Sequence, residues 1–126
     1  MTTTAVLDTN ALMMPVELGI RVFEEVDRLF DETECLVPEA VVDELDDLSS
    51  GHGEAATAAS VGKDLANRCR VVETNASYAD DAIVELATEG EFDAVVTNDR
   101  PLRDRLLSRG VRVVGVRGNR LGITEP

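Results

Sequence analysis

The sequence has few of the side chains on which many catalytic and metal sites depend. Its 126 residues include one histidine, two cysteines and no tryptophan. His52 lies in the glycine-rich stretch SSGHGE, which is typical of a solvated loop, and Cys35 and Cys69 lack the spacing of a zinc site. We therefore expect two free thiols, and we do not expect histidine chemistry.

Long apolar runs are also absent. No run reaches the ~20 residues that a membrane-spanning helix needs. The first ten residues, MTTTAVLDTN, contain neither the basic region nor the apolar segment of a secretory signal. We expect a cytoplasmic protein without membrane contacts. A length of 126 residues and a hydrophobic content of 44% predict a single globular domain over residues 1–126.

Positive charge is scarce and unevenly distributed. The net charge is −13, and Lys63 is the only lysine. An acid-rich, lysine-poor surface suits a cytoplasm of very high salt, where the Debye length falls to ~3 Å, so we expect a halophilic source; an ordinary acidic protein is the alternative. Residues 100–126, however, carry seven arginines and two acids. A polyanion could bind there, although a solvated basic helix face would explain the same pattern.

Apolar runs of strand length alternate with helical patterns along the chain. We expect strands over residues 4–7, 34–37, 70–73, 94–97 and 111–116. We expect helices over residues 16–30, 38–48, 54–67, 77–90 and 101–109, and an irregular tail from 117 to 126. This alternation predicts an α/β fold with a central parallel sheet covered by helices on both faces.

Two of the predicted strands each end on a carboxylate beside threonine and asparagine. Asp8 follows the first strand in VLDTN, and Asp99 follows a later strand in VVTND. The simplest explanation is that each acid caps the following helix. Parallel sheets also form binding sites beyond the carboxyl ends of their strands, so the two acids would meet if their strands are neighbours.

Two more acids lie on or beside the apolar faces of predicted helices. Glu44 lies three residues after Val41 and four before Leu48, which places it near the same side of a helix. Asp80 lies three residues before Ile83 and four before Val84, with the same consequence. Clustered carboxylates repel one another by several kcal/mol, and residues 31–62 contain no lysine or arginine to offset this. A hard divalent cation, Mg²⁺ or Mn²⁺, would relieve the repulsion.

The neighbouring Asp81 is the alternative to Asp80. Helix geometry favours Asp80, because its positions three, four and seven residues ahead are all apolar, whereas those of Asp81 include Glu85 and Thr88. Asp81 also has a structural reason to be there, since a carboxylate near a helix N-terminus is stabilised by the helix dipole.

Four stretches of the chain resemble the PIN-domain endoribonucleases. They are VLDTN, PEAVVDEL, YADDAIVELA and VVTNDRPLRDRL, in the order of the family. The resemblance implies a Rossmann-like three-layer α/β/α sandwich and an acid cluster that binds one or two Mg²⁺ or Mn²⁺ ions for RNA hydrolysis. Carried over by motif, the catalytic and metal-binding acids are Asp8, Glu44, Asp80 and Asp99. Asn10 and Thr97 resemble the polar residues that orient these acids.

Within the family, the chain is similar to archaeal relatives of the small-subunit processome PIN nuclease. The stretches YADDAIVELA, TNDRPLRDRLLSRGV and VRGNRLGI carry this similarity. It implies processing of a ribosomal RNA precursor, with a ribosome-assembly partner. The alternatives are a VapC-like toxin with a separate antitoxin, and an RNA-binding assembly factor with little turnover. PIN domains commonly dimerise, so the resemblance also implies a homodimer.

Two other phosphate-handling classes fit less well. A HAD-type phosphatase needs a second acid two residues after the first, where this chain has Asn10. A receiver domain needs a lysine after a late strand, but Lys63 falls in a predicted helix. For RNA binding, the candidates are Arg100 and Arg103 beside Asp99, and Tyr78 as a stacking platform.

Overall fold

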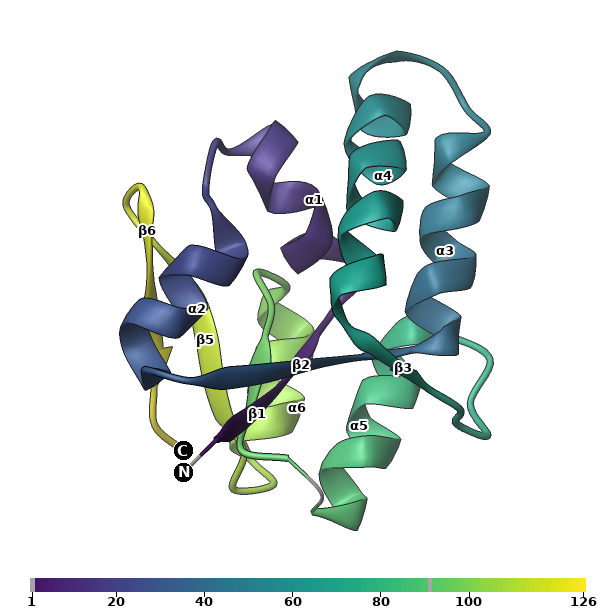
Figure 1. The fold of residues 1–126 in the computed structure, drawn as a ribbon. Coiled ribbons are helices and arrows are strands. Elements are labelled where there is room, and N and C mark those ends of the chain that lie inside the picture. Colours follow the sequence, from purple (N-terminus) through teal and green to yellow (C-terminus); the bar gives the residue numbers. More distant parts are fainter. Residues whose placement is uncertain (1, 91) are drawn as a thin grey trace.

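The computed structural model describes residues 2–90 and 92–126, in which a six-stranded sheet lies between layers of helices (Figure 1). The strands are β1 (Thr3–Leu7), β2 (Thr33–Pro38), β3 (Arg70–Val72), β4 (Ala94–Val96), β5 (Arg112–Arg117) and β6 (Arg120–Thr124). The helices are α1 (Thr9–Glu17), α2 (Val22–Phe30), α3 (Glu39–Ser49), α4 (Gly53–Leu65), α5 (Ala79–Glu89) and α6 (Arg100–Leu107), with a 3₁₀ turn over Ala66–Arg68. The predicted α/β fold with a central, mostly parallel sheet is confirmed.

The strand order places the ends of β1 and β4 side by side. The order is β3-β2-β1-β4-β5-β6, and β1 pairs in parallel with both β2 and β4. The chain therefore extends the sheet in one direction from β1 to β3, then returns to β4 and extends it in the other. Ligand sites in open α/β sheets form beyond the carboxyl ends of the strands where the order reverses. Here that position lies directly beyond Leu7 and Val96.

The two central strands are apolar because helices cover both of their faces. Every residue from Ala5 to Leu7 and from Ala94 to Val96 is fully buried. These strands form a rigid base for the residues that follow them. Within the described residues, no helix combines the length and apolar character needed to cross a bilayer.

The single helix predicted over residues 16–30 is wrong, because two helices occupy this region. Helix α1 begins at Thr9, directly after β1, and α2 begins at Val22. Between them Gly19 has a φ of +67°, a left-handed conformation that glycine adopts without steric cost. The apolar periodicity continues across this break, which is why the pattern indicated one helix.

The irregular tail predicted over residues 117–126 is also wrong. Residues Arg120–Thr124 form β6, which pairs antiparallel with β5. The connection is the two-residue turn Gly118–Asn119, where Gly118 has a φ of +64°. A Gly-Asn pair between two strand-like runs indicates a β-hairpin, so the sequence itself contains the signal for this turn.

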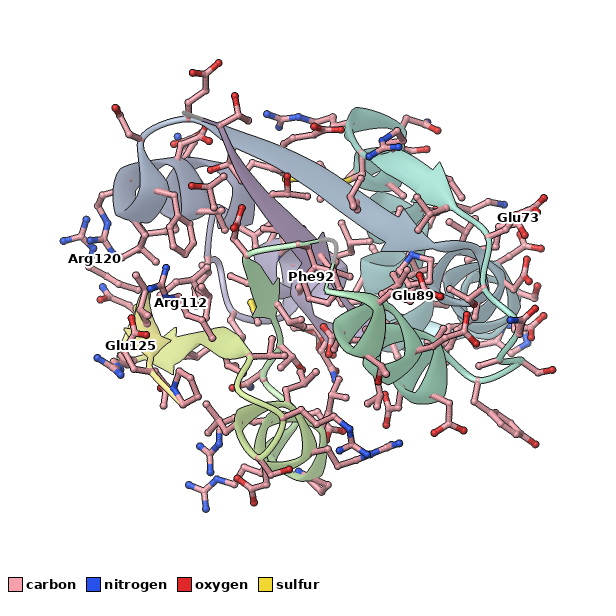
Figure 2. All side chains as sticks on the ribbon, turned by 90° about the horizontal axis from the view of Figure 1, so that it is seen from below. Glu73, Glu89, Phe92, Arg112, Arg120 and Glu125 are labelled. Atoms are coloured by element: carbon pink, nitrogen blue, oxygen red, sulfur yellow. The ribbon has the colours of Figure 1, made fainter. Side chains whose placement is uncertain are left out.

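Side chains of the first half of the chain hold this hairpin in place. Glu25 of α2 accepts a hydrogen bond from the Leu121 backbone N–H at 3.0 Å, and Arg28 donates one to the Leu121 carbonyl at 2.8 Å. The Arg28 guanidinium beside Glu25 lowers the pKa of that carboxyl to about 2. Arg112 and Glu125 form an ion pair at the far end of the hairpin (Figure 2).

We predict that the folded protein becomes more stable with added salt. The net charge is −13, and ion pairs such as Arg21–Glu24 and Arg70–Glu34 are solvent-exposed and contribute little. Screening of the self-repulsion should raise the melting temperature by at least about 5 °C between low and molar KCl, equivalent to about 1 kcal/mol. Differential scanning calorimetry at pH 7 in EDTA measures this. A melting temperature that does not change would contradict the halophilic interpretation.

Candidate active site

Asp8 and Asp99 each cap a helix at the carboxyl end of a central strand. The Asp8 Oδ1 accepts a hydrogen bond from the Ala11 N–H of α1 at 2.8 Å. The Asp99 Oδ1 accepts one from the Leu102 N–H of α6, also at 2.8 Å. Capping, the simplest explanation for these residues, is therefore correct. Capping uses only one oxygen of each carboxylate.

Thr97 links the two acids. Its side chain is buried, its hydroxyl donates a hydrogen bond to Asp8 Oδ2, and the same hydroxyl oxygen accepts one from the Asp99 N–H at 3.1 Å. Thr97 can do this because it follows β4, which is the direct neighbour of β1. It therefore holds the Asp8 carboxylate in one orientation and positions the turn that carries Asp99.

All four acids suggested by the sequence line one hollow at this end of the sheet. Asp8 and Asp99 lie at its base, Glu44 comes from α3, and Asp80 and Asp81 come from the first turn of α5. Glu44 is exposed, although the adjacent Leu45 is fully buried, so Glu44 lies beside the apolar face of α3 rather than in it. Asn10 and Tyr78 also line the hollow, and Tyr78 is 77% exposed.

Burial makes Asp8 an unusual carboxyl group. Its pKa rises from 3.8 to about 7, first because the side chain is removed from water and also because Asp80 and Asp99 are negatively charged. The hydrogen bonds from Thr97 and Ala11 oppose this shift only in part. An acid whose pKa lies near neutrality, with two further acids close by, is a frequent feature of functional sites.

Asp80 and Asp81 differ in their surroundings. Burial raises the pKa of Asp80, and the negative charge of Asp99 raises it further. Asp81 instead forms an ion pair with Arg105 of α6 at 3.1 Å. Asp81 is thus directly paired with Arg105, whose positive charge also lowers the pKa of Asp80, whereas Asp80 adds to the negative field around Asp8.

Comparison with known proteins identifies the family. The sequence profile described as "PIN like domain" matches residues 5–119. This chain belongs to the PIN-like domain family. The family predicted from the four motifs is therefore confirmed. Among curated proteins, "Ribonuclease VapC4" of Methanocaldococcus jannaschii is 28% identical over 114 residues, which cover 87% of each chain.

Two solved structures share this fold. The PIN domain endonuclease Utp24 superposes with a TM-score of 0.80 at 24% identity, over 98% of this chain and 92% of that one. VapBC2 from Rickettsia felis, bound to a DNA fragment from its promoter, superposes with a TM-score of 0.58 at 14% identity, over 91% of this chain and 100% of that one. At these identities the likeness establishes the fold.

The acidic hollow of this PIN-like domain fits a hard divalent cation that keeps some of its water ligands. Its donors are carboxylate oxygens, and the Thr9 hydroxyl at its wall is buried without a hydrogen-bond partner among the described residues. Within residues 2–90 and 92–126, no three acidic, histidine or cysteine side chains are close enough to enclose an ion by themselves. Mg²⁺ usually needs only one or two carboxylates besides water and substrate oxygens.

Other residues discussed from the sequence lie elsewhere. His52 is exposed at the start of α4, and Cys35 and Cys69 are free thiols outside the hollow. Sequence reasoning missed Thr9, whose orphaned hydroxyl depends on packing, and Arg105, whose pairing with Asp81 joins two helices that no sequence spacing relates.

Proposed function

We propose that this PIN-like domain is an endoribonuclease that depends on Mg²⁺ or Mn²⁺. The observation that carries the proposal is the buried Asp8, whose pKa is about 7 and which lies near Asp80 and Asp99 where the strand order reverses. The 28% identity to a ribonuclease over 87% of both chains supports RNA as the substrate. Exposed Tyr78 at the wall of the hollow adds a surface on which an unpaired base could stack.

The residues of the site have distinct roles in this proposal. Asp8, Asp80 and Asp99 would hold the cation or cations, together with Glu44 from α3. When bound, one or two such ions would neutralise the carboxylates and stabilise the charge that develops on the phosphodiester during attack by water. Thr97 keeps the Asp8 carboxylate oriented, Asn10 supports the acids as a polar residue in the lining of the hollow, and Arg105 pairs with Asp81.

Ribosomal RNA processing is the biological role that we favour. The sequence similarity to archaeal relatives of the small-subunit processome PIN nuclease supports it, in the stretches YADDAIVELA and VRGNRLGI. A VapC-like toxin with an antitoxin partner is the second candidate, favoured by the identity to VapC4. The dimer common in PIN domains would apply to either role.

Cleavage of unstructured RNA by the purified protein tests the activity. We expect single-turnover cleavage with Mn²⁺ or Mg²⁺ in molar KCl, and none in EDTA or with Ca²⁺, whose larger radius and flexible coordination suit this chemistry poorly. A toxin should arrest growth when expressed without its antitoxin, whereas a processing enzyme should leave growth intact and cut precursor ribosomal RNA at a defined position. RNA binding without metal-dependent cleavage would instead indicate an assembly factor.

We predict that Arg100 and Arg103 guide RNA toward the acids. Both residues line a second hollow that also includes Asp99, and α6 starts with Arg100 directly after that acid. Replacing both with Ala should weaken binding for every RNA sequence and reduce the slope of log K against log salt by about 1.4, which is 0.7 for each phosphate that the variant no longer neutralises. Fluorescence anisotropy across a salt series measures this. An unchanged slope would mean that these arginines form only a solvated face.

A further inference from the structure

The second hollow is positively charged in a molecule that is otherwise strongly acidic. It lies between the start of α6 and the β5–β6 hairpin, and Arg100, Arg103 and Arg117 line it together with the single acid Asp99. Arg103 contacts the exposed Asp104 at 3.2 Å, and Arg100 forms no ion pair within residues 2–90 and 92–126. Three guanidinium groups around one hollow form a site for an anion with several oxygens.

Arg117 is the most constrained of these three arginines. Its side chain lies across Gly122 of β6, where a Cβ atom would be only 2.5 Å from the Arg117 Cδ and 2.9 Å from its Nε. One terminal nitrogen donates hydrogen bonds to the Ile123 carbonyl at 2.6 Å and the Thr124 hydroxyl at 3.2 Å. A guanidinium has five N–H groups, so these two bonds fix its plane and leave three donors for a ligand.

The two hollows adjoin each other at Asp99. Asp99 lines both of them, and Thr97, which orients Asp8 in the acidic hollow, also lines the arginine hollow. A strand bound with one phosphate at the acids would therefore place a nearby phosphate among the arginines. Residues 1–99 contain 23 acids and five basic residues, so few other positions could attract a polyanion to this site.

We propose that the arginine hollow binds an RNA backbone phosphate next to the one that is cleaved, and that Arg117 provides the oriented fork for it. Gly122 is a positioning residue, because only the absence of a side chain there lets Arg117 lie along the hairpin toward the hollow. The proposal rests on the proposed nuclease function and adds to it the residue and the backbone feature that align the RNA strand.

The test measures RNA binding in EDTA, so that it does not depend on cleavage. We expect Arg117→Met to weaken binding of a short single-stranded RNA about tenfold and to reduce the salt slope by about 0.7. Arg117→Lys should retain most of the slope, because it keeps the charge, but should not recover the full affinity. Gly122→Ala should act like Arg117→Lys, because the added Cβ displaces the Arg117 side chain but leaves its charge in the protein. The matched controls are Arg21→Met, just before α2, and Gly51→Ala, whose Cβ would meet its nearest atom at 3.4 Å. Both should leave the affinity and the salt slope unchanged.

A scan with a single neutral methylphosphonate linkage locates the bound phosphate. One linkage near the cleaved position should weaken binding to the wild-type protein about tenfold and have no effect on Arg117→Met, since that variant already lacks the same interaction. If no linkage shows this coupling, or if Arg117→Met behaves like Arg21→Met, the subsite is overturned. If inorganic phosphate binds in a way that depends on Arg117, but no methylphosphonate linkage shows the coupling, the hollow is a site for free phosphate and the RNA subsite is overturned.

Failure of the nuclease proposal would look different. It would appear as wild-type protein that cleaves no RNA with any divalent ion. The binding measurements in EDTA would still be decisive for the arginine hollow.

Discussion

Replacing Asp8 with Asn should abolish RNA cleavage and at the same time make the metal-free protein more stable above neutral pH. Asp8 is buried, bonded to Thr97 and near two other acids, so Asn loses a charge that a cation needs while it keeps nearly the same shape. We expect single-turnover cleavage to fall by at least about 100-fold. Asp43→Asn, an exposed change on the same helix as Glu44, should cleave at the wild-type rate.

The stability effect has a defined dependence on pH. The pKa of Asp8 is about 7 in the folded protein and 3.8 in the unfolded chain, so between these values the folded state binds more protons. The contribution of Asp8 to stability is therefore highest below pH 4, falls as the pH rises to about 7, and is constant above that. The full loss is on the order of 4 kcal/mol.

Denaturant unfolding in EDTA at several pH values isolates this contribution. The difference in the free energy of unfolding between Asp8→Asn and wild type should grow from pH 4 to pH 7 and then level off. Added Mn²⁺ should reverse the order by stabilising only the wild-type protein. A variant that cleaves at the native rate would contradict the role of Asp8, and a difference that does not vary with pH would contradict its raised pKa.

Asp80→Asn should inactivate the enzyme, whereas Asp81→Asn should leave much of the activity. Asp80 contributes its charge to the field around Asp8, whereas Asp81 is held in an ion pair with Arg105 at 3.1 Å. We expect Asp80→Asn to weaken Mn²⁺ binding at least about tenfold and to reduce cleavage about 100-fold. Asp81→Asn should cost a few tenths of a kcal/mol in stability, because it removes an exposed ion pair.

Calorimetry with Mn²⁺ and single-turnover cleavage, applied to both variants, measure this contrast. Arg105→Met removes a positive charge from the lining of the acidic hollow and should strengthen Mn²⁺ binding. Inactive Asp81→Asn combined with active Asp80→Asn would mean that Asp81 is the ligand and Asp80 the structural residue.

Local pattern predicted the central part of this molecule well. The buried strands β1 and β4 appear in the sequence as short apolar runs. Asp8 and Asp99 follow these strands, at the edge of the sheet where parallel sheets form binding sites. The errors occurred where periodicity continues through a break. Gly19 separates two helices within one continuous apolar pattern. A single helix would show the same pattern, because one residue with a left-handed backbone does not change the spacing of the apolar residues around it.

By itself, the sequence determined the α/β class, the PIN motifs and the four candidate acids, since these depend on side-chain period and on residues that follow one another in the chain. Only the tertiary structure decided that β1 and β4 are neighbours, so that Thr97 can bond Asp8 across 89 positions of sequence. It also decided that Asp81 is paired with Arg105 and that Arg117 lies over Gly122. The physical reason is that burial, charge pairing and close approach are properties of surfaces that touch, and folding brings those surfaces together from distant parts of the chain.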